Sequence, residues 1–485
     1  MSDQIRQLEP TVLWNHFADL NAVPRPSKKE ERVIQFIKSF GEELSLPTGV
    51  DEAGNVIIKK PASKGMEDRK TIVLQSHLDM VHQKNSGTDF NFDQQGIEMY
   101  VDGDWVKAKG TTLGADNGIG VAAIMSLLAS KDITHPPLEA LFTIDEETGM
   151  TGALALKGGL LDGSIMLNLD TEEDNELTIG CAGGLDVTAK GNYQQEQPTA
   201  NKAFMLFVKG LTGGHSGMDI HKGRGNANKI MNRVLLDLSI KFEINIASID
   251  GGSLRNAIPR ESTALIAVND IYIKELNTAI EEHNNIIKAE YSFTDPNLSI
   301  GIETAAIPET VMEPSFQLSF LRAVYSCPNG IYRMTPEIPG LVQSSNNIAK
   351  LTAKDGSYTI MCLTRSSVDT EKFDLGQSIS SAFELIGAGM DYGSEYPGWA
   401  PRPSSEIVTL MSGIYKELFN EEVHANAVHA GLECGIIGTN YPEMQMISFG
   451  PNITGAHSPD EKVQVSSVQK FWRYLLEILK RIPKK

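Results

Sequence analysis

Strand-like and helix-like segments alternate along the chain up to about residue 190, and this alternation constrains the fold more than any other feature. The strand-like segments are short and mostly apolar: NVIIKK, TIVLQS, LEALFTI and SIMLNL. Two segments with apolar residues at helical spacing, GVAAIMSLLASKD and GALALKGG, stand between some of them. Strands that alternate with helices predict an α/β domain built on a largely buried sheet.

A helix is also predicted shortly after the N-terminus. Ser27 is followed three residues later by Glu30, which is the capping-box pattern. Apolar residues then recur at helical spacing between Val33 and Phe40. We therefore expect a helix here, with Ser27 at its N-cap.

Two polar interruptions divide the chain. The first, GNYQQEQPTANKA, covers residues 191–203, and the second, GSEYPGWAPRPSSE, covers 393–406 and is rich in Pro, Gly and Ser. The segment between them has strand-like and helix-like stretches of its own, and about 200 residues are enough for a separate core. We predict a discontinuous first domain, residues 1–190 plus 396–485, and a second domain inserted at 191–395.

Composition and charge exclude several classes of partner. The 62 acidic residues outnumber the 43 basic ones, and the net charge of −19 opposes binding to nucleic acid or to an anionic membrane. The four cysteines lie far apart and form no C-x-x-C pair, which predicts reduced thiols. No apolar signal core opens the sequence and no run is long enough to cross a membrane, so we expect a cytoplasmic protein.

The segment KTIVLQSHLDMVHQ ends its predicted strand with two residues that can carry chemistry. His77 and Asp79 are two positions apart, and such residues point the same way in an extended chain. We therefore expect an imidazole and a carboxylate side by side at the end of a buried strand.

Acidic residues also follow the neighbouring segments. Asp116 lies in the glycine-rich turn TTLGADNGIG, the pair Glu146–Glu147 follows LFTID, and Asp170 follows IMLNL. Ligands of open α/β sheets bind outside the carboxyl ends of the strands. So many carboxylates there would repel one another unless cations neutralised them. A late loop of small residues, GPNITGAHSPDE, adds His457.

Each of these residues also has a simpler explanation. Asp116 could be only a helix N-cap, and His77 with Asp79 only a surface pair. The acidic pair after LFTID could be a solvated strand end. Taken together, two histidines, three carboxylates and a spare glutamate suit two divalent ions, each with one imidazole and one carboxylate, and with a shared carboxylate between them.

The order of the motifs resembles a known family. H-x-D, G-x-D-N-G, E-E, D and a late G-x-H-S-P follow one another as in the co-catalytic zinc peptidases of the M20 type. Longer stretches resemble the aminoacyl-histidine dipeptidases, also called cytosolic non-specific dipeptidases: QSHLDMV, GTTLGADNGIG, GCAGG, GGHSG, LRNAIPRE, HAGLECG and GPNITGAHSPDE. The resemblance extends over essentially the whole chain. It implies an α/β, two-domain di-zinc peptidase, with a discontinuous α/β catalytic domain and an inserted α+β lid and dimerisation domain.

The resemblance assigns a metal-binding role to five residues. It implies two divalent metal ions, zinc in the first place and cobalt or manganese as alternatives, held by His77, Asp116, Glu147, Asp170 and His457. Within this set His77 and Asp170 hold one ion, Glu147 and His457 hold the other, and Asp116 bridges them.

Two further carboxylates are catalytic by the same resemblance. Asp79 orients the imidazole of His77. Glu146 is the general base that takes a proton from a water bridging the two metals. Adjacent residues on an extended chain face opposite ways, so Glu147 can bind metal while Glu146 reaches the water.

The implied substrate-binding residues lie in the inserted domain: His215, Asn256 and Arg365. An imidazole donor suits an oxyanion, and an arginine fork suits a free C-terminal carboxylate. The same three residues could instead be a core histidine, a turn asparagine and a surface arginine. The implied activity is hydrolysis of dipeptides with a free N-terminus, including Xaa-His dipeptides such as carnosine, by a homodimer.

Other functions remain compatible with parts of the pattern. A tripeptide aminopeptidase or an N-acyl amino acid deacylase would share the metal set, although not the full-length motifs. A two-metal phosphoesterase would need a basic or glycine-cradled phosphate site, and we find no convincing one. A non-catalytic binding protein would be expected to lack Glu146 or a ligand, and none is missing.

Overall fold

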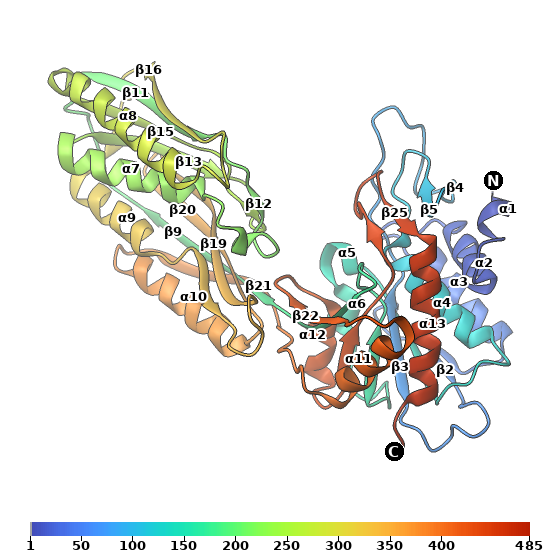
Figure 1. Ribbon diagram of the computed structural model, residues 1–485. Coiled ribbons are helices and arrows are strands. Elements are labelled where there is room, and N and C mark those ends of the chain that lie inside the picture. Colours follow the sequence, from blue (N-terminus) through green and yellow to red (C-terminus); the bar gives the residue numbers. More distant parts are fainter. Residues whose placement is uncertain (1) are drawn as a thin grey trace. The chain divides into compact units, whose positions relative to one another are not determined.

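The computed structural model describes residues 2–485 and divides the chain into two compact units (Figure 1). The first unit is discontinuous and comprises the chain up to Gly180 together with Pro401–Ala427 and Leu432–Lys485. The second comprises Cys181–Ala400 and Val428–Gly431.

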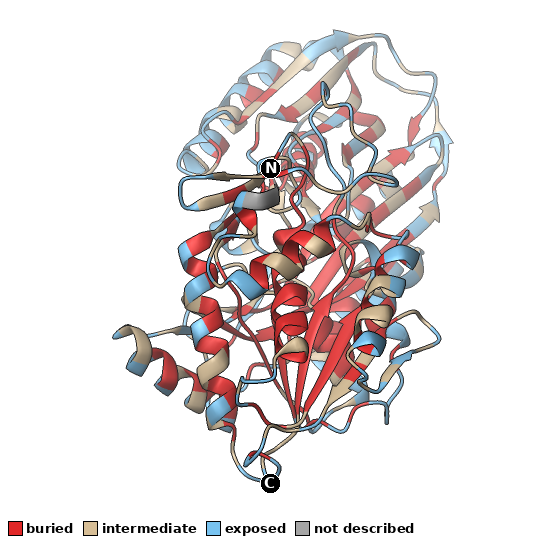
Figure 2. Ribbon diagram, turned by 90° about the vertical axis from the view of Figure 1, so that its right-hand side faces the viewer, coloured by how far each residue is buried: buried red, intermediate tan, exposed pale blue. Residues whose placement is uncertain are grey.

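The core of the first unit is an eight-stranded mixed sheet. Its strands follow the order β1 (Thr48–Val50), β2 (Val56–Lys60), β6 (Leu138–Thr143), β3 (Ile72–His77), β7 (Ile165–Asn168), β23 (Gln445–Ser448), β8 (Glu176–Cys181) and β22 (His424–Val428). The central strands β6, β3, β7 and β23 are parallel. Every residue of β3, β6 and β7 is buried (Figure 2). Parallel strands covered on both faces are continuous apolar runs, which is why the sequence pattern predicted them correctly.

Helices α4 (Ala115–Ala129) and α12 (Glu433–Asn440) cover opposite faces of β3. On one face Ser76 approaches Gly120 of α4 so closely that a Cβ on this glycine would lie 2.5 Å from the serine Oγ. The preceding residue, Gln75, points the other way and donates a hydrogen bond to Glu433 of α12. The predicted α/β class is confirmed.

Further elements complete the first unit. Its other helices are α1 (Ser2–Ile5), α2 (Thr11–Asn21), α3 (Glu31–Glu43), α5 (Glu146–Gly149), α6 (Thr151–Ala155), α11 (Glu406–Phe419) and α13 (Val465–Arg481). A small antiparallel sheet has the order β24 (Ile453–Thr454), β25 (Lys462–Gln464), β5 (Trp105–Ala108) and β4 (Met99–Asp102).

The predicted capping box is wrong. Helix α3 begins at Glu31, and no side chain caps it. The chain turns at Lys28, whose φ is +68°, before the helix starts. Ser27 therefore lies outside the helix, and its hydroxyl donates to Oδ2 of Asp79 at 2.8 Å.

The second unit is built on a nine-stranded antiparallel sheet. Its strands follow the order β16 (Ser299–Ala305), β11 (Lys202–Lys209), β15 (Ser262–Val268), β13 (Asn245–Gly252), β19 (Val342–Lys354), β20 (Ser357–Ser366), β9 (Gly183–Asn192) and β21 (Gly389–Tyr396), and β18 (Gly330–Met334) also pairs with β19. Strand β9 pairs with β20 and β21 in this sheet, so the second unit begins earlier than the predicted boundary at 191.

Four helices lie in one layer against this sheet (Figure 1): α7 (Ala227–Phe242), α8 (Ile273–Glu290), α9 (Pro314–Ser326) and α10 (Asp369–Glu384). Leu235 and Leu276 of the helices and Ile266 and Ile360 of the strands belong to the buried core between the two layers. Two short ribbons complete the unit, β10 (Gln195–Glu196) with β17 (Val311–Met312) and β12 (Gly214–His215) with β14 (Ala257–Ile258). An antiparallel sheet with helices on one face is an α+β arrangement.

Two further predictions concern the whole chain. The four cysteines are buried thiols, as expected. Among residues 2–485, no helix combines the length and the apolar character that crossing a membrane requires.

We predict that Leu74→Ala destabilises the first unit. Leu74 is fully buried in β3, and a core leucine changed to alanine costs about 2–5 kcal/mol because a cavity remains. Leu154→Ala in α6 is the matched control, since Leu154 is 51% exposed. Urea unfolding followed by tryptophan fluorescence should show a lower midpoint for Leu74→Ala alone. Equal midpoints for the two variants would contradict the placement of β3 in the core.

Candidate metal centre

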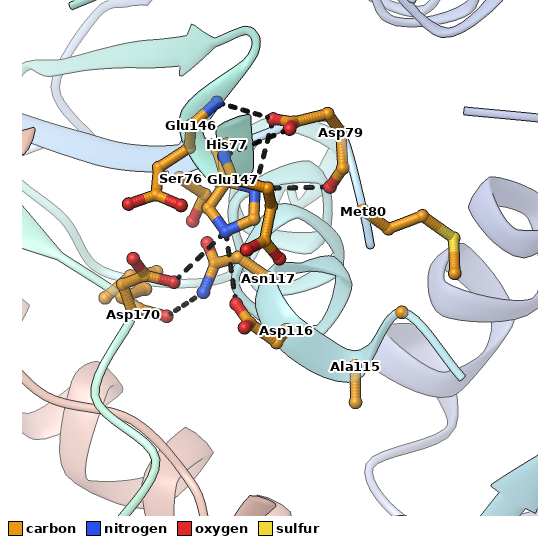
Figure 3. Close-up of polar contacts among 12 residues, drawn as sticks. Ser76, His77, Asp79, Met80, Ala115, Asp116, Asn117, Glu146, Glu147 and Asp170 are labelled. Atoms are coloured by element: carbon orange, nitrogen blue, oxygen red, sulfur yellow. Dashed lines mark hydrogen bonds and ion pairs between the residues drawn. The ribbon is translucent and has the colours of Figure 1, made fainter. Parts of the chain in front are cut away.

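The five predicted metal ligands meet at the carboxyl ends of the central strands. His77 ends β3, Asp170 follows β7, and Glu147 lies in α5 just after β6. Asp116 lies at the start of α4, and His457 lies in the loop between β24 and β25. Figure 3 shows four of them, His77, Asp116, Glu147 and Asp170, around one centre.

Asp116 lies between the two imidazoles. Its Oδ1 is 3.1 Å from Nε2 of His77, and its Oδ2 is 3.2 Å from Nε2 of His457. Asp170 Oδ1 lies 3.5 Å from the same nitrogen of His77, and Glu147 Oε2 lies 3.0 Å from that of His457. Each imidazole therefore faces one carboxylate of its own and one oxygen of the shared carboxylate.

These separations suit ligands of metal ions. Two ligands of one tetrahedral zinc ion, each at its usual bond length, lie roughly 3.3 Å apart. Two groups of three residues, one with Asp170 and His77 and one with Glu147 and His457, can each hold an ion, and both include Asp116. Within residues 2–485, the buried Oε1 of Glu147 has no hydrogen-bond partner. Such an oxygen is costly to bury unless a cation or a proton compensates it.

The carboxylates act strongly on the two imidazoles. Burial lowers the pKa of His77, but the facing carboxylates of Asp170 and Asp116 outweigh it and raise this pKa well above its ordinary value. Hydrogen bonds to Asp116 and Glu147 raise the pKa of His457 to about 11. Both imidazoles therefore hold protons that a metal ion must displace.

Asp79 lies behind His77. Nδ1 of His77, the ring nitrogen that faces away from the carboxylate cluster, lies 3.2 Å from the backbone oxygen of Asp79 and 3.4 Å from its Oδ1. The two carboxylate oxygens of Asp79 also accept the backbone N–H groups of Glu146 and Glu147 at 3.0 and 3.3 Å (Figure 3), and the hydroxyl of Ser27 at 2.8 Å. One buried carboxylate thus links the imidazole to the segment that follows β6, an arrangement that fixes the tautomer and orientation of a ligating histidine.

Glu146 and Glu147 do not lie in an extended segment. The prediction that their side chains face opposite ways because the chain is extended is therefore wrong. They open the short helix α5, after Asp145 with a φ of +52°. Neighbouring residues of a helix differ in direction by roughly 100°, and Figure 3 shows the two carboxylates extending apart. Burial raises the pKa of Glu146 well above its ordinary value; His77 opposes this shift and Asp170 adds to it.

The three predicted substrate-binding residues come together within the second unit. Strands β12 and β14 pair so that His215 lies opposite Ala257, the residue after Asn256. The buried guanidinium of Arg365 has its Nε 3.5 Å from Oγ of Ser216, the residue after His215.

The hydrogen bonds of this group define its chemistry. Nδ1 of His215 accepts the backbone N–H groups of Gly217 and Met218 at 3.2 and 3.0 Å. The proton of the neutral ring is therefore on Nε2, which is a donor. Arg365 is buried and donates to Oη of Tyr396 at 2.8 Å. A buried cation beside an N–H donor can receive an anion.

A buried polar layer beneath the metal centre was not predicted. Glu433 accepts hydrogen bonds from Nε2 of Gln75 at 2.6 Å and from Oγ1 of Thr143 at 2.7 Å. Gln75 in turn accepts a hydrogen bond from Asn168. The layer thus joins β6, β3 and β7 to α12 just below the ligands. Two signals in the sequence point to it: the polar Gln75 within the apolar run TIVLQS, and Glu433 within the motif HAGLECG, which could be expected to line a pocket.

Known proteins share both the sequence and the fold. Residues 73–481 match the model of peptidase family M20/M25/M40. The chain is 41% identical over 483 residues to the cytosol non-specific dipeptidase of Escherichia coli (strain K12), covering 99% of this chain and 100% of that one. It is 42% identical to the crystal structure of aminoacylhistidine dipeptidase from Vibrio alginolyticus, with a TM-score of 0.94 over 100% of both chains.

A more distant structure shares the fold alone. The crystal structure of aminopeptidase PepT from Bacillus cereus is 16% identical and has a TM-score of 0.56, covering 98% of this chain and 99% of that one. The resemblance seen in the sequence motifs is confirmed by the family match and by the two near relatives, and this chain belongs to peptidase family M20/M25/M40.

Proposed function

We propose that this protein is a metal-dependent dipeptidase that hydrolyses dipeptides with a free N-terminus, including Xaa-His dipeptides such as carnosine. The observation that carries the proposal is the position of Asp116, whose two oxygens face two different imidazoles. The names of the Escherichia coli and Vibrio alginolyticus relatives, which match over the full length, support dipeptides as the substrate class.

Two divalent metal ions complete the proposed site, zinc in the first place and cobalt or manganese as alternatives. In this assignment His77 and Asp170 hold one ion, Glu147 and His457 hold the other, and Asp116 is shared. The set of imidazoles and carboxylates suits these metals. When bound, the pair acts as a Lewis acid that lowers the pKa of a water and polarises the scissile carbonyl.

The chain's own residues then move the protons. Glu146 is the proposed general base: it takes the proton of the attacking water and returns it to the leaving amine. Burial raises the pKa of Glu146 well above its ordinary value, which makes it a stronger base than an exposed glutamate. Asp79 keeps His77 in the tautomer that presents Nε2 to the metal.

We assign substrate recognition to the second unit, the inserted segment predicted at 191–395. The guanidinium of Arg365 binds the C-terminal carboxylate of the dipeptide, His215 donates its Nε2–H to the oxyanion, and Asn256 adds an amide group. We further propose that this segment joins two copies in a homodimer, and that the protein is cytoplasmic, as the name of the Escherichia coli relative suggests.

Chelation of divalent metal should abolish dipeptide hydrolysis, and zinc, cobalt or manganese should restore it. The raised pKa values of His77 and His457 mean that both rings are protonated near neutral pH in the metal-free protein. Metal affinity should therefore weaken as pH falls, by about tenfold per pH unit for each proton displaced. Calorimetric titration in buffers of different ionisation enthalpy counts these protons. Full activity in a preparation shown to be metal-free would refute the metal requirement.

Changing Glu146 to Gln should lower kcat by about 10² or more, because the general base is lost. Metal content should remain near the wild-type value, since the proposed ligand Glu147 is intact. Glu147→Gln is the matched comparison and should lose metal as well as activity. Both quantities are measured on the same samples, by atomic emission and by hydrolysis of one dipeptide. Loss of metal from Glu146→Gln alone would show that the two roles are reversed.

Arg365 and His215 should have separable kinetic effects. Arg365→Ala should chiefly raise KM and narrow the preference for a dipeptide over its C-terminal amide. His215→Ala should chiefly lower kcat, since an oxyanion donor acts in the transition state. Arg233→Ala is the control, because Arg233 is a part-exposed arginine of the same unit that pairs with Glu290. If Arg365→Ala prefers the dipeptide over its C-terminal amide as strongly as the wild type does, another residue must bind the C-terminal carboxylate.

A further inference from the structure

The turn that carries Asp116 is held by a buried carboxylate outside the proposed ligand set. Glu461 accepts hydrogen bonds from four consecutive backbone N–H groups of this turn. Its Oε2 accepts from Leu113 at 2.6 Å and Gly114 at 2.9 Å, and its Oε1 accepts from Ala115 at 2.7 Å and Asp116 at 3.3 Å. Both oxygens are used, and the backbone of the turn is fixed at each of its residues.

The position of Glu461 in the chain makes this contact a link between two proposed ligands. Glu461 is 3% exposed and lies against a turn that is not regular helix, since the backbone angles of Asp116 and Asn117 are non-helical. The N–H groups of the turn therefore need an acceptor from another part of the chain, and Glu461 provides it. Glu461 also follows His457 closely in the sequence, within the motif AHSPDE. The segment that carries His457 is thereby attached to the turn that carries Asp116.

Arg25 holds the carbonyl side of the same turn. Its buried guanidinium donates to the backbone oxygen of Gly114 at 2.6 Å and to those of Leu78 and Asp79 at 3.0 and 3.1 Å. Leu78 directly follows His77. Gly114 has a φ of +69°, and a Cβ there would lie 2.5 Å from Nη2 of Arg25, so only glycine fits. Arg25 therefore attaches the turn to the segment that carries His77.

We propose that Arg25 and Glu461 are positioning residues that set the spacing of the two metal positions before any ion binds. The inference rests on the proposed function, because it takes Asp116 as the shared ligand. Neither residue hydrogen bonds to a proposed ligand side chain; each acts on the backbone of the turn. The requirement is physical: carboxylates gathered at one centre repel one another, and a shared ligand works only if it is held within a fraction of an ångström.

A plain helix cap elsewhere in the first unit provides the control. Asp104 accepts hydrogen bonds from the backbone N–H of Ser466 at 3.0 Å and from the side chain of Gln464 at 2.9 Å, at the start of α13. It is exposed and contributes nothing to the metal centre. Asp104→Asn and Glu461→Gln therefore make the same chemical change at two carboxylates of the first unit that accept backbone N–H groups.

Glu461→Gln should weaken metal binding by about 10- to 100-fold in competition with a chelator, as is typical when a group that orients metal ligands is lost. At saturating metal its kcat should fall while KM for a dipeptide stays within about twofold. Asp104→Asn should lower the melting temperature yet leave metal affinity, kcat and KM unchanged. Wild-type metal affinity and kcat in a folded Glu461→Gln variant would overturn the proposal.

A second measurement needs no variant. Hydrogen exchange of the amides of Leu113, Gly114, Ala115 and Asp116 should be equally slow in the metal-free and the metal-loaded wild-type protein. Fast exchange confined to the metal-free protein would show that metal, and not the two charged residues, orders the turn. Dipeptide hydrolysis by the wild type is scored separately. An inactive wild type with protected amides and Glu461-dependent metal binding would refute the proposed activity and leave the positioning role intact.

Discussion

The concentration of negative charge at the carboxyl ends of β6, β3 and β7 is the constraint on which the first unit depends. Parallel strands bring these ends to one edge, so Asp170 and the residues after β6 arrive beside His77 whatever their distance in sequence. Helix α4 then adds Asp116 between the two imidazoles. Such a cluster is stable only with compensating cations or protons, and the raised pKa values of both histidines express the same requirement.

The surroundings of the cluster hold its members mainly through backbone and outer polar groups. Asp79 takes the backbone N–H groups of Glu146 and Glu147, and Glu461 takes those of the turn before α4. Below the ligands, Gln75 joins β3 to α12 by donating a hydrogen bond to Glu433, and to β7 by accepting one from Asn168. The backbone on both sides of the cluster is thus held by groups that lie outside the proposed ligand set.

The two units offer opposite chemistry. The first gathers carboxylates and suits cations, including the ammonium group of a peptide N-terminus. Within the second, a buried guanidinium at Arg365 lies beside His215 with an Nε2–H donor, and this pair suits the C-terminal carboxylate and an oxyanion. Neither set alone distinguishes a dipeptidase from other hydrolases with a two-metal centre.

The sequence by itself determined the α/β class, the central strands and the set of residues now proposed as ligands. Buried parallel strands are continuous apolar runs, so the sequence pattern reveals them. His77, Glu147 and Asp170 come at or just after the ends of such runs, and Asp116 comes at the start of a helix-like segment. Those signals lie within short segments, so they can be recognised in the sequence without a structure. Longer motifs added the family, which the comparisons confirm.

Only the tertiary structure decided how those residues are held. Ser27 matches a capping box in the sequence, but the chain turns at Lys28 and the hydroxyl of Ser27 donates a hydrogen bond to Asp79 instead. Glu461 and Leu113 are 348 residues apart in the sequence. Glu461 accepts hydrogen bonds from backbone N–H groups, which every residue except proline possesses. A hydrogen bond to the backbone does not require a particular residue type, so the sequence does not reveal it. The sequence therefore gives the chemical type of each side chain, whereas the backbone geometry that orients these side chains forms only when the chain folds.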